Sequence, residues 1–105
     1  MTNIEKIQNE IVEKLKPLHP QKIILFGSYA TGNETQDSDI DMLVIMPFEG
    51  NPISKSAEMR LSLSSKVPID LLVRTPQQIE HRLEIGDYFY QEILDKGKVL
   101  YEEIN

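Results

Sequence analysis

Three short apolar segments limit most strongly what this chain can fold into. Residues 22–26, 40–46 and 67–73 are rich in Ile, Leu and Val and are bounded by Gly, Pro or polar residues. Runs of this length and composition are typical of buried β-strands. Every residue from Met42 to Met46 is apolar, which indicates burial on both faces and a central place in the sheet.

The remaining segments have mainly helical patterns. Asn51 and Asp87 are each expected to cap a helix. A short helix is expected directly after Gly27 and Ser28. The other predicted elements are helices over 3–16, 53–65 and about 76–85, a last short helix ending at Gly97, and an edge strand over 98–101. This order predicts an α/β (α+β) fold, in which helices pack on a small mixed sheet of three to four strands. Residues 1–105 are expected to form one domain.

Composition excludes several kinds of chemistry. The chain has no cysteine, which excludes disulfides, zinc–thiolate sites and thiol nucleophiles. Its net charge is −6 and no basic stripe is visible, so direct nucleic-acid binding is not expected. The longest apolar run, at 42–46, is far too short to span a bilayer. The N-terminal residues lack the apolar core of a secretory signal, and a cytoplasmic location is expected.

A Gly-Ser pair lies where the first predicted strand ends. Gly27 follows residues 22–26 directly, and Ser28 comes next. Glycine lets the backbone approach a ligand closely, and N–H groups at a helix start favour a phosphate. Two interpretations stay open, namely a phosphate-binding turn and an ordinary strand-to-helix turn in which Ser28 is the cap.

Two aspartates lead into the second predicted strand. Asp39 and Asp41 flank Ile40, so in a strand their side chains share one face at a spacing of about 7 Å. Carboxylates this close repel each other unless a cation lies between them. The alternative is that both lie in a loop and are merely solvated, although the apolar strand that follows at once weakens it.

A third aspartate, Asp70, lies inside the apolar segment 67–73. An unpaired charge there is costly, so it needs a partner, a metal or an edge position facing water. If the third strand lies beside the second, Asp70 joins Asp39 and Asp41 in an oxygen-ligand site suited to Mg²⁺. A phosphate site next to such carboxylates is what metal-dependent transfer from a nucleoside triphosphate needs.

These residues resemble a known signature. Gly27-Ser28, ten intervening residues and then Asp39-x-Asp41 are similar to the GS-x10-D-x-D motif of the DNA polymerase beta-like nucleotidyltransferases. The short length, the segment DSDID and the later strand aspartate resemble a minimal nucleotidyltransferase (MNT) domain. The resemblance covers nearly the whole chain. It extends to the antitoxin half of bacterial HEPN–MNT toxin–antitoxin pairs.

The resemblance implies the fold of that superfamily and a set of residue roles. Gly27 and Ser28 would bind the triphosphate of ATP. Asp39 and Asp41 would bind two Mg²⁺ ions. Asp70 would be a ligand of the catalytic metal and help to activate the acceptor hydroxyl, as ligand or general base. One departure is Thr31, which stands where many relatives have arginine.

The resemblance also implies a function and a partner. The chain would move AMP from ATP to a hydroxyl, expected to be a tyrosine, of a helical HEPN ribonuclease toxin, with which it would form a hetero-oligomer. Two alternatives stay open. One is an antitoxin or binding module that occludes its partner without catalysis. The other is a nucleotidyltransferase acting on a small molecule such as an aminoglycoside, with a helper subunit.

Two further features are interpreted mainly as structural. Tyr88, Phe89 and Tyr90 begin a predicted helix and are expected to pack in the core rather than stack on a base, although one face of them could dock a partner. Arg74 follows the third predicted strand. It is expected either to contact phosphate near Asp70 or to lie at a solvated strand end.

Overall fold

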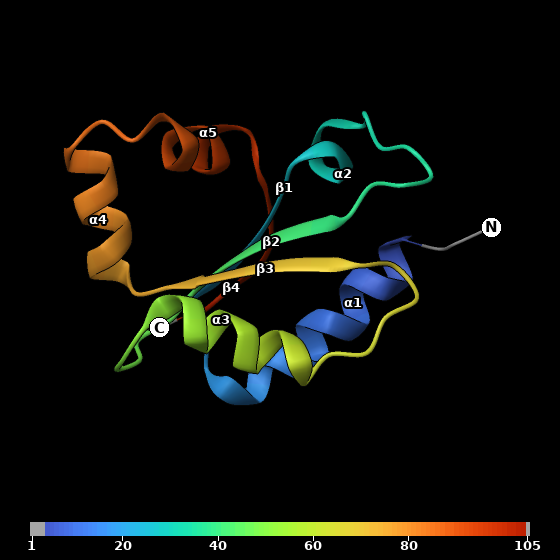
Figure 1. Cartoon of the computed structure of the whole chain (residues 1–105), viewed down its shortest axis with the longest axis horizontal. Helices are drawn as coiled ribbons and strands as arrows, with labels where there is room; N and C mark the ends of the chain where they lie inside the picture. Colours follow the sequence, from blue (N-terminus) through green and yellow to red (C-terminus); the bar gives the residue numbers. More distant parts are fainter. Residues whose placement is uncertain (1–3, 105) are drawn as a thin grey trace.

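The computed structural model describes residues 4–104 and contains one mixed four-stranded sheet with helices on both faces (Figure 1). The strand order is β3-β2-β1-β4, in which β2 pairs parallel with β3 and β1 pairs antiparallel with both β2 and β4. The strands are β1 (Lys22–Phe26), β2 (Ile40–Ile45), β3 (Ile69–Arg74) and β4 (Lys98–Glu102). The predicted fold class, the central place of the second strand and the final edge strand are confirmed.

Three of the helices begin at a residue whose side chain caps them. The Asn51 side chain accepts hydrogen bonds from the N–H groups of Ile53 and Ser54, and Asp87 accepts one from Phe89, as predicted. Thr75 and Gln78 form a reciprocal capping box, which satisfies two otherwise unpaired N–H groups. The helices are α1 (Ile4–Leu15), α2 (Ser28–Thr31), α3 (Pro52–Leu61), α4 (Pro76–Glu84), α5 (Tyr88–Lys96) and the 3₁₀ turn η1 (Lys16–Leu18).

Alternate residues of β2 pack into two different hydrophobic cores. Met42 and Val44 pack with residues of α1 and α3 on one face of the sheet. Leu43 and Ile45 pack with residues of α4 and α5 on the other. Side chains of a strand alternate between the faces of a sheet, so a central strand covered on both sides is apolar at nearly every position.

A helix side chain partly covers the free edge of β3. The buried Ser56 of α3 donates to the Pro52 carbonyl at 2.7 Å and accepts from the Val73 N–H at 2.8 Å. An open strand edge presents unpaired backbone groups that favour aggregation. Ser56 therefore satisfies one of these groups and fixes α3 against the edge strand.

The structure differs from the prediction in the segment between α3 and β3. The helix expected over 53–65 ends at Leu61. The Ser62 hydroxyl donates to the Met59 carbonyl at 2.6 Å, and the Ser65 hydroxyl accepts from the Val67 N–H at 3.1 Å. Serine side chains compete in this way with the backbone bonds that would continue a helix.

The described residues, 4–104, contain no helix long and apolar enough to cross a membrane.

Candidate functional site

The pairing of three strands places Phe26, Asp41 and Asp70 in one row across the sheet. Asp41 is the register partner of Phe26 in antiparallel β1 and of Asp70 in parallel β3. Directly paired residues share a face of the sheet. This is the face covered by α4 and α5, since Asp41 alternates with Ile40 and Met42, which belong to the opposite core. The structure therefore brings Asp70 beside Asp41.

Asp70 lies at a sheet edge facing water and also beside the second strand, two positions that the sequence analysis leaves open for it. The strand β3 lies at an edge of the sheet and also beside β2. Asp70 is exposed, and its main chain pairs with that of Asp41. Water solvates its charge, so the carboxylate can lie within an otherwise apolar strand. Asp39 is also exposed and immediately precedes β2.

Gly27 forms the turn between β1 and the single-turn helix α2. It is the N-cap residue, with φ 75° and ψ −155°, and Ser28 is the first helical residue. The alternative in which Ser28 caps the helix is therefore wrong. The Gly27 carbonyl accepts from the N–H groups of Ala30 and Thr31, so the backbone of this residue closes the turn.

The carboxylate of Asp41 fills the space beside Gly27. A Cβ atom on residue 27 would collide with Oδ2 of Asp41 and lie 3.1 Å from its Cγ. The backbone conformation of Gly27 is also one that is essentially restricted to glycine. Two independent constraints thus require glycine here. The Gly-Ser turn therefore lies against the paired carboxylates Asp41 and Asp70, which we call the aspartate row.

The surroundings of the Asp41 carboxylate disfavour its ionised form. Partial burial raises the pKa of Asp41, and the nearby charges of Asp70 and Asp39 raise it further. Both causes disfavour the charged form. A bound cation would offset the repulsion between Asp41 and these two neighbouring carboxylates.

The donor set suits Mg²⁺ only if the substrate supplies further ligands. Within residues 4–104, no group of three His, Cys, Asp or Glu side chains could hold a metal ion. Magnesium usually binds to one or two carboxylates together with phosphate oxygens and water. Asp41 and Asp70, paired on one face of the sheet, match this mode.

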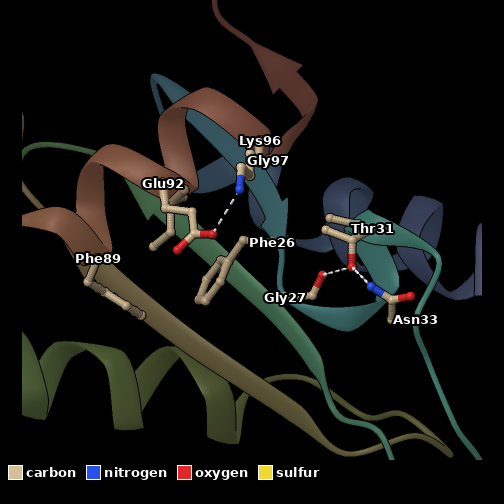
Figure 2. Close-up of a pocket in the computed structure, with 10 residues that line it drawn as sticks. Phe26, Gly27, Thr31, Asn33, Phe89, Glu92, Lys96 and Gly97 are labelled. Atoms are coloured by element: carbon tan, nitrogen blue, oxygen red, sulfur yellow. Dashed lines mark hydrogen bonds and ion pairs between the residues drawn. The ribbon is translucent and has the colours of Figure 1, made fainter.

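A cavity of about 520 Å³ lies beside Gly27, and Figure 2 shows residues that line it. It lies between β1, α2 and α5, and Gly27 and Phe26 line it next to Asp41. Phe89 and Lys96 of α5 line it on the other side. Sequence reasoning did not place these two residues at the site, because only the packing of α5 on the sheet brings them there.

Arg74 lies away from the aspartate row. It ends β3, four residues after Asp70, and pairs in register with Ile45 at the far end of β2. Its guanidinium donates to the Tyr90 hydroxyl at 3.2 Å and to the Val73 carbonyl at 2.8 Å. The structure therefore places Arg74 at a strand end, as one alternative predicts, but partly buried and hydrogen-bonded rather than fully solvated, and not beside Asp70.

The sequence pattern of the nucleotidyltransferase domain family matches residues 4–100. The chain belongs to this family. The match includes the Gly-Ser turn and all three aspartates, so the motif residues of this nucleotidyltransferase lie on or directly beside three adjoining strands of one sheet. The resemblance inferred from the sequence is confirmed at the level of the family.

Individual relatives agree with this assignment. A protein of Methanocaldococcus jannaschii named "Putative protein adenylyltransferase" is 33% identical over 102 residues, which cover 94% of this nucleotidyltransferase and 99% of the relative. A crystal structure of a toxin–antitoxin complex with AMP-PNP matches with a TM-score of 0.64 and 26% identity, over 91% of this chain and 73% of that one. A crystal structure of the MntA–HpeT toxin–antitoxin complex, with a tyrosine-to-alanine substitution, matches with a TM-score of 0.59 and 26% identity. The match covers 98% of this chain and 75% of that one.

Proposed function

We propose that this nucleotidyltransferase moves AMP from ATP to a hydroxyl group of a partner protein in the presence of Mg²⁺. The observation that carries the proposal is the register pairing of Asp41 with Asp70 beside Gly27. It places a turn able to approach phosphate next to two carboxylates on an open part of the sheet. The name of the archaeal relative, a protein adenylyltransferase, supports the choice of AMP and of a protein acceptor.

Each residue of the site has a proposed role. The backbone of Gly27 and the hydroxyl of Ser28 bind the triphosphate. Asp39 and Asp41 would hold the Mg²⁺ ions, and Asp70 would be a further ligand. When bound, Mg²⁺ would offset the charge of the phosphates and stabilise the entering and leaving oxygens.

The reaction is a displacement at the α-phosphorus of ATP. The acceptor oxygen forms a bond to this phosphorus, while the bond from the phosphorus to the bridging oxygen of the β-phosphate breaks. Pyrophosphate leaves with the electrons of that bond. Asp70 is exposed on the edge strand, so an acceptor from solvent can reach it, and its carboxylate accepts the proton of the hydroxyl.

We further propose that the acceptor is a tyrosine of a HEPN-type toxin and that the modification neutralises the toxin. Two of the solved structures that this chain resembles are toxin–antitoxin complexes, one of them with AMP-PNP. The site is open along the β3 edge of the sheet, which leaves room for a protein to bring its own hydroxyl. The proposal includes a hetero-oligomer of toxin and antitoxin.

Transfer of label from ATP tests the proposal. The protein is incubated with Mg²⁺, ATP labelled at the α-phosphate, and the product of the adjacent gene. The Asp39→Ala/Asp41→Ala double variant is run beside it, and Asp37→Ala serves as a matched control because Asp37 is an exposed aspartate of the same loop. Label is expected on the second protein with the wild type and Asp37→Ala, and to disappear with the double variant or with EDTA.

Other outcomes distinguish the alternatives. A stable complex with the double variant, together with no label on protein in any sample, would contradict transfer and indicate neutralisation by occlusion. If an extract of the host cells is added and the label appears on a small molecule, the protein would instead be a small-molecule nucleotidyltransferase.

A further inference from the structure

We propose that the cavity between β1 and α5 binds the base of the nucleotide, with Phe89 as the surface on which the base stacks. This inference rests on the proposed function, because it assumes that the phosphates lie at Gly27 and the aspartate row. It assigns to Phe89 a role in binding in place of the core-packing role that the sequence suggests.

The cavity adjoins the proposed phosphate site at Gly27. Gly27 lines the cavity and also lies against the Asp41 carboxylate. Phe26 lines it too and is the register partner of Asp41. A nucleotide whose α-phosphate lies at Asp41 can therefore place its base in the cavity, with the ribose between the two sites.

The size and lining of the cavity suit a nucleobase. Its volume of about 520 Å³ falls within the range of small-molecule sites, about 300–1,000 Å³. Phe26 and Phe89 form aromatic walls, and polar groups of α2 and α5 lie around them (Figure 2). Sites for flat heteroaromatic ligands combine apolar walls with a few polar groups in this way.

Phe89 is held in place although it is half exposed. Its ring packs edge-to-face on Phe26 at 5.8 Å and on Tyr90 at 5.2 Å between centroids. Tyr90 is itself buried and accepts a hydrogen bond from Arg74. Phe89 nevertheless remains 49% exposed. An aromatic ring oriented by two neighbours, with one side open to a cavity, is a preorganised stacking surface.

An ion pair at the rim offers groups for the edge of the base. Lys96 Nζ lies 3.3 Å from Glu92 Oε1, and both residues line the cavity. A lysine donates hydrogen bonds and a carboxylate accepts them. Side by side, the two complement the ring nitrogens and the amino group of an adenine.

Comparison of two ligands tests the inference. Affinities of the full chain for ATP and for inorganic tripolyphosphate are measured by calorimetry in the presence of Mg²⁺. The wild type is expected to bind ATP more tightly than tripolyphosphate. Phe89→Ala is expected to weaken ATP binding by about 5- to 150-fold, as for loss of one base-stacking aromatic, and to leave tripolyphosphate binding unchanged.

Two further variants separate stacking from structural effects. Phe89→Tyr keeps the ring and is expected to bind ATP within about twofold of the wild type. Tyr88→Ala is the matched control, because Tyr88 is an adjacent aromatic, 68% exposed, that does not line the cavity. It is expected to bind both ligands as the wild type does.

Several results would overturn the inference. Phe89→Ala could bind ATP as tightly as the wild type, or could lose both ligands equally, which would indicate a structural role. The wild type could bind ATP and tripolyphosphate equally well, which would show that the base is not held while leaving the phosphate site intact. Binding of neither ligand would overturn the proposed function itself.

Discussion

The carboxylate of Asp41 occupies the space that a side chain on residue 27 would need. A Cβ atom on Gly27 would collide with Oδ2 of Asp41, and Gly27 has a φ of 75°. Gly27 directly follows β1 and Asp41 lies in the adjacent strand β2, so the two residues belong to different parts of the sequence motif. The motif is therefore also a packing unit, in which the turn and the aspartate fit only if the first residue is glycine.

Gly27→Ala is expected to destabilise the fold and weaken nucleotide binding. The strained backbone alone costs about 1–3 kcal/mol, and displacement of Asp41 adds to this cost. The free energy of unfolding from urea denaturation measures the first effect, and calorimetry with ATP measures the second. Gly32→Ala is the matched control. Gly32 also has a positive φ, 78°, but a Cβ atom at this position would have no neighbour within 4 Å. Equal losses for both variants would show that the contact with Asp41 contributes nothing.

Asp41→Asn is expected to make the metal-free protein more stable at pH 7. The pKa of folded Asp41 is raised above its ordinary value of 3.8 by burial and by Asp70 and Asp39. Between these two pKa values the folded state binds more protons than the unfolded state, so stability falls as the pH rises through that interval. The asparagine variant removes this loss. Its melting temperature in EDTA should exceed that of the wild type at pH 7 and match it below pH 3.8.

The control for that experiment is Asp37→Asn, which changes the charge of an exposed loop residue by the same amount. It should leave the pH dependence of the melting temperature close to that of the wild type. A lower melting temperature of Asp41→Asn at pH 7 would contradict the raised pKa of Asp41.

Asp70→Asn is expected to slow the transfer of AMP by about 10²- to 10⁴-fold, the range for loss of a general acid–base group. Asp70 is exposed at the sheet edge, so the variant should fold normally. Initial rates of label transfer measure the effect, and circular dichroism checks the fold. Asp95→Asn, at an exposed position of α5, is the control. A rate equal to that of the wild type would remove Asp70 from the site.

Ser56→Ala is expected to lower the free energy of unfolding by about 1–3 kcal/mol, the cost of leaving a buried N–H unsatisfied. The Ser56 hydroxyl accepts the hydrogen bond from Val73 N–H on the edge strand. Ser54→Ala, at an exposed position of the same helix, should change stability much less. Urea denaturation of the two variants gives the comparison, and equal stabilities would contradict the role of Ser56 at the edge.

Local patterns in the sequence predicted most of the secondary structure. The segment 22–26 is a strand as predicted, and Asn51 and Asp87 cap helices as predicted. These features depend on residues close together in the chain, such as a cap and the N–H groups two or three residues later. The prediction failed at the end of α3, where Ser62 bonds back to Met59, because such competing local bonds leave no apolar pattern.

The sequence by itself identified candidate residues for the proposed site: the Gly-Ser turn, Asp39 and Asp41, and an aspartate within a third strand. The tertiary structure decided how they meet. Only the parallel pairing of β2 with β3 places Asp70 beside Asp41, and only the packing of α5 on the sheet brings Phe89 to Phe26. Strand order and helix docking depend on contacts between segments far apart in the chain. Periodicity within a single segment shows which face of it is buried and does not identify the segment that covers it.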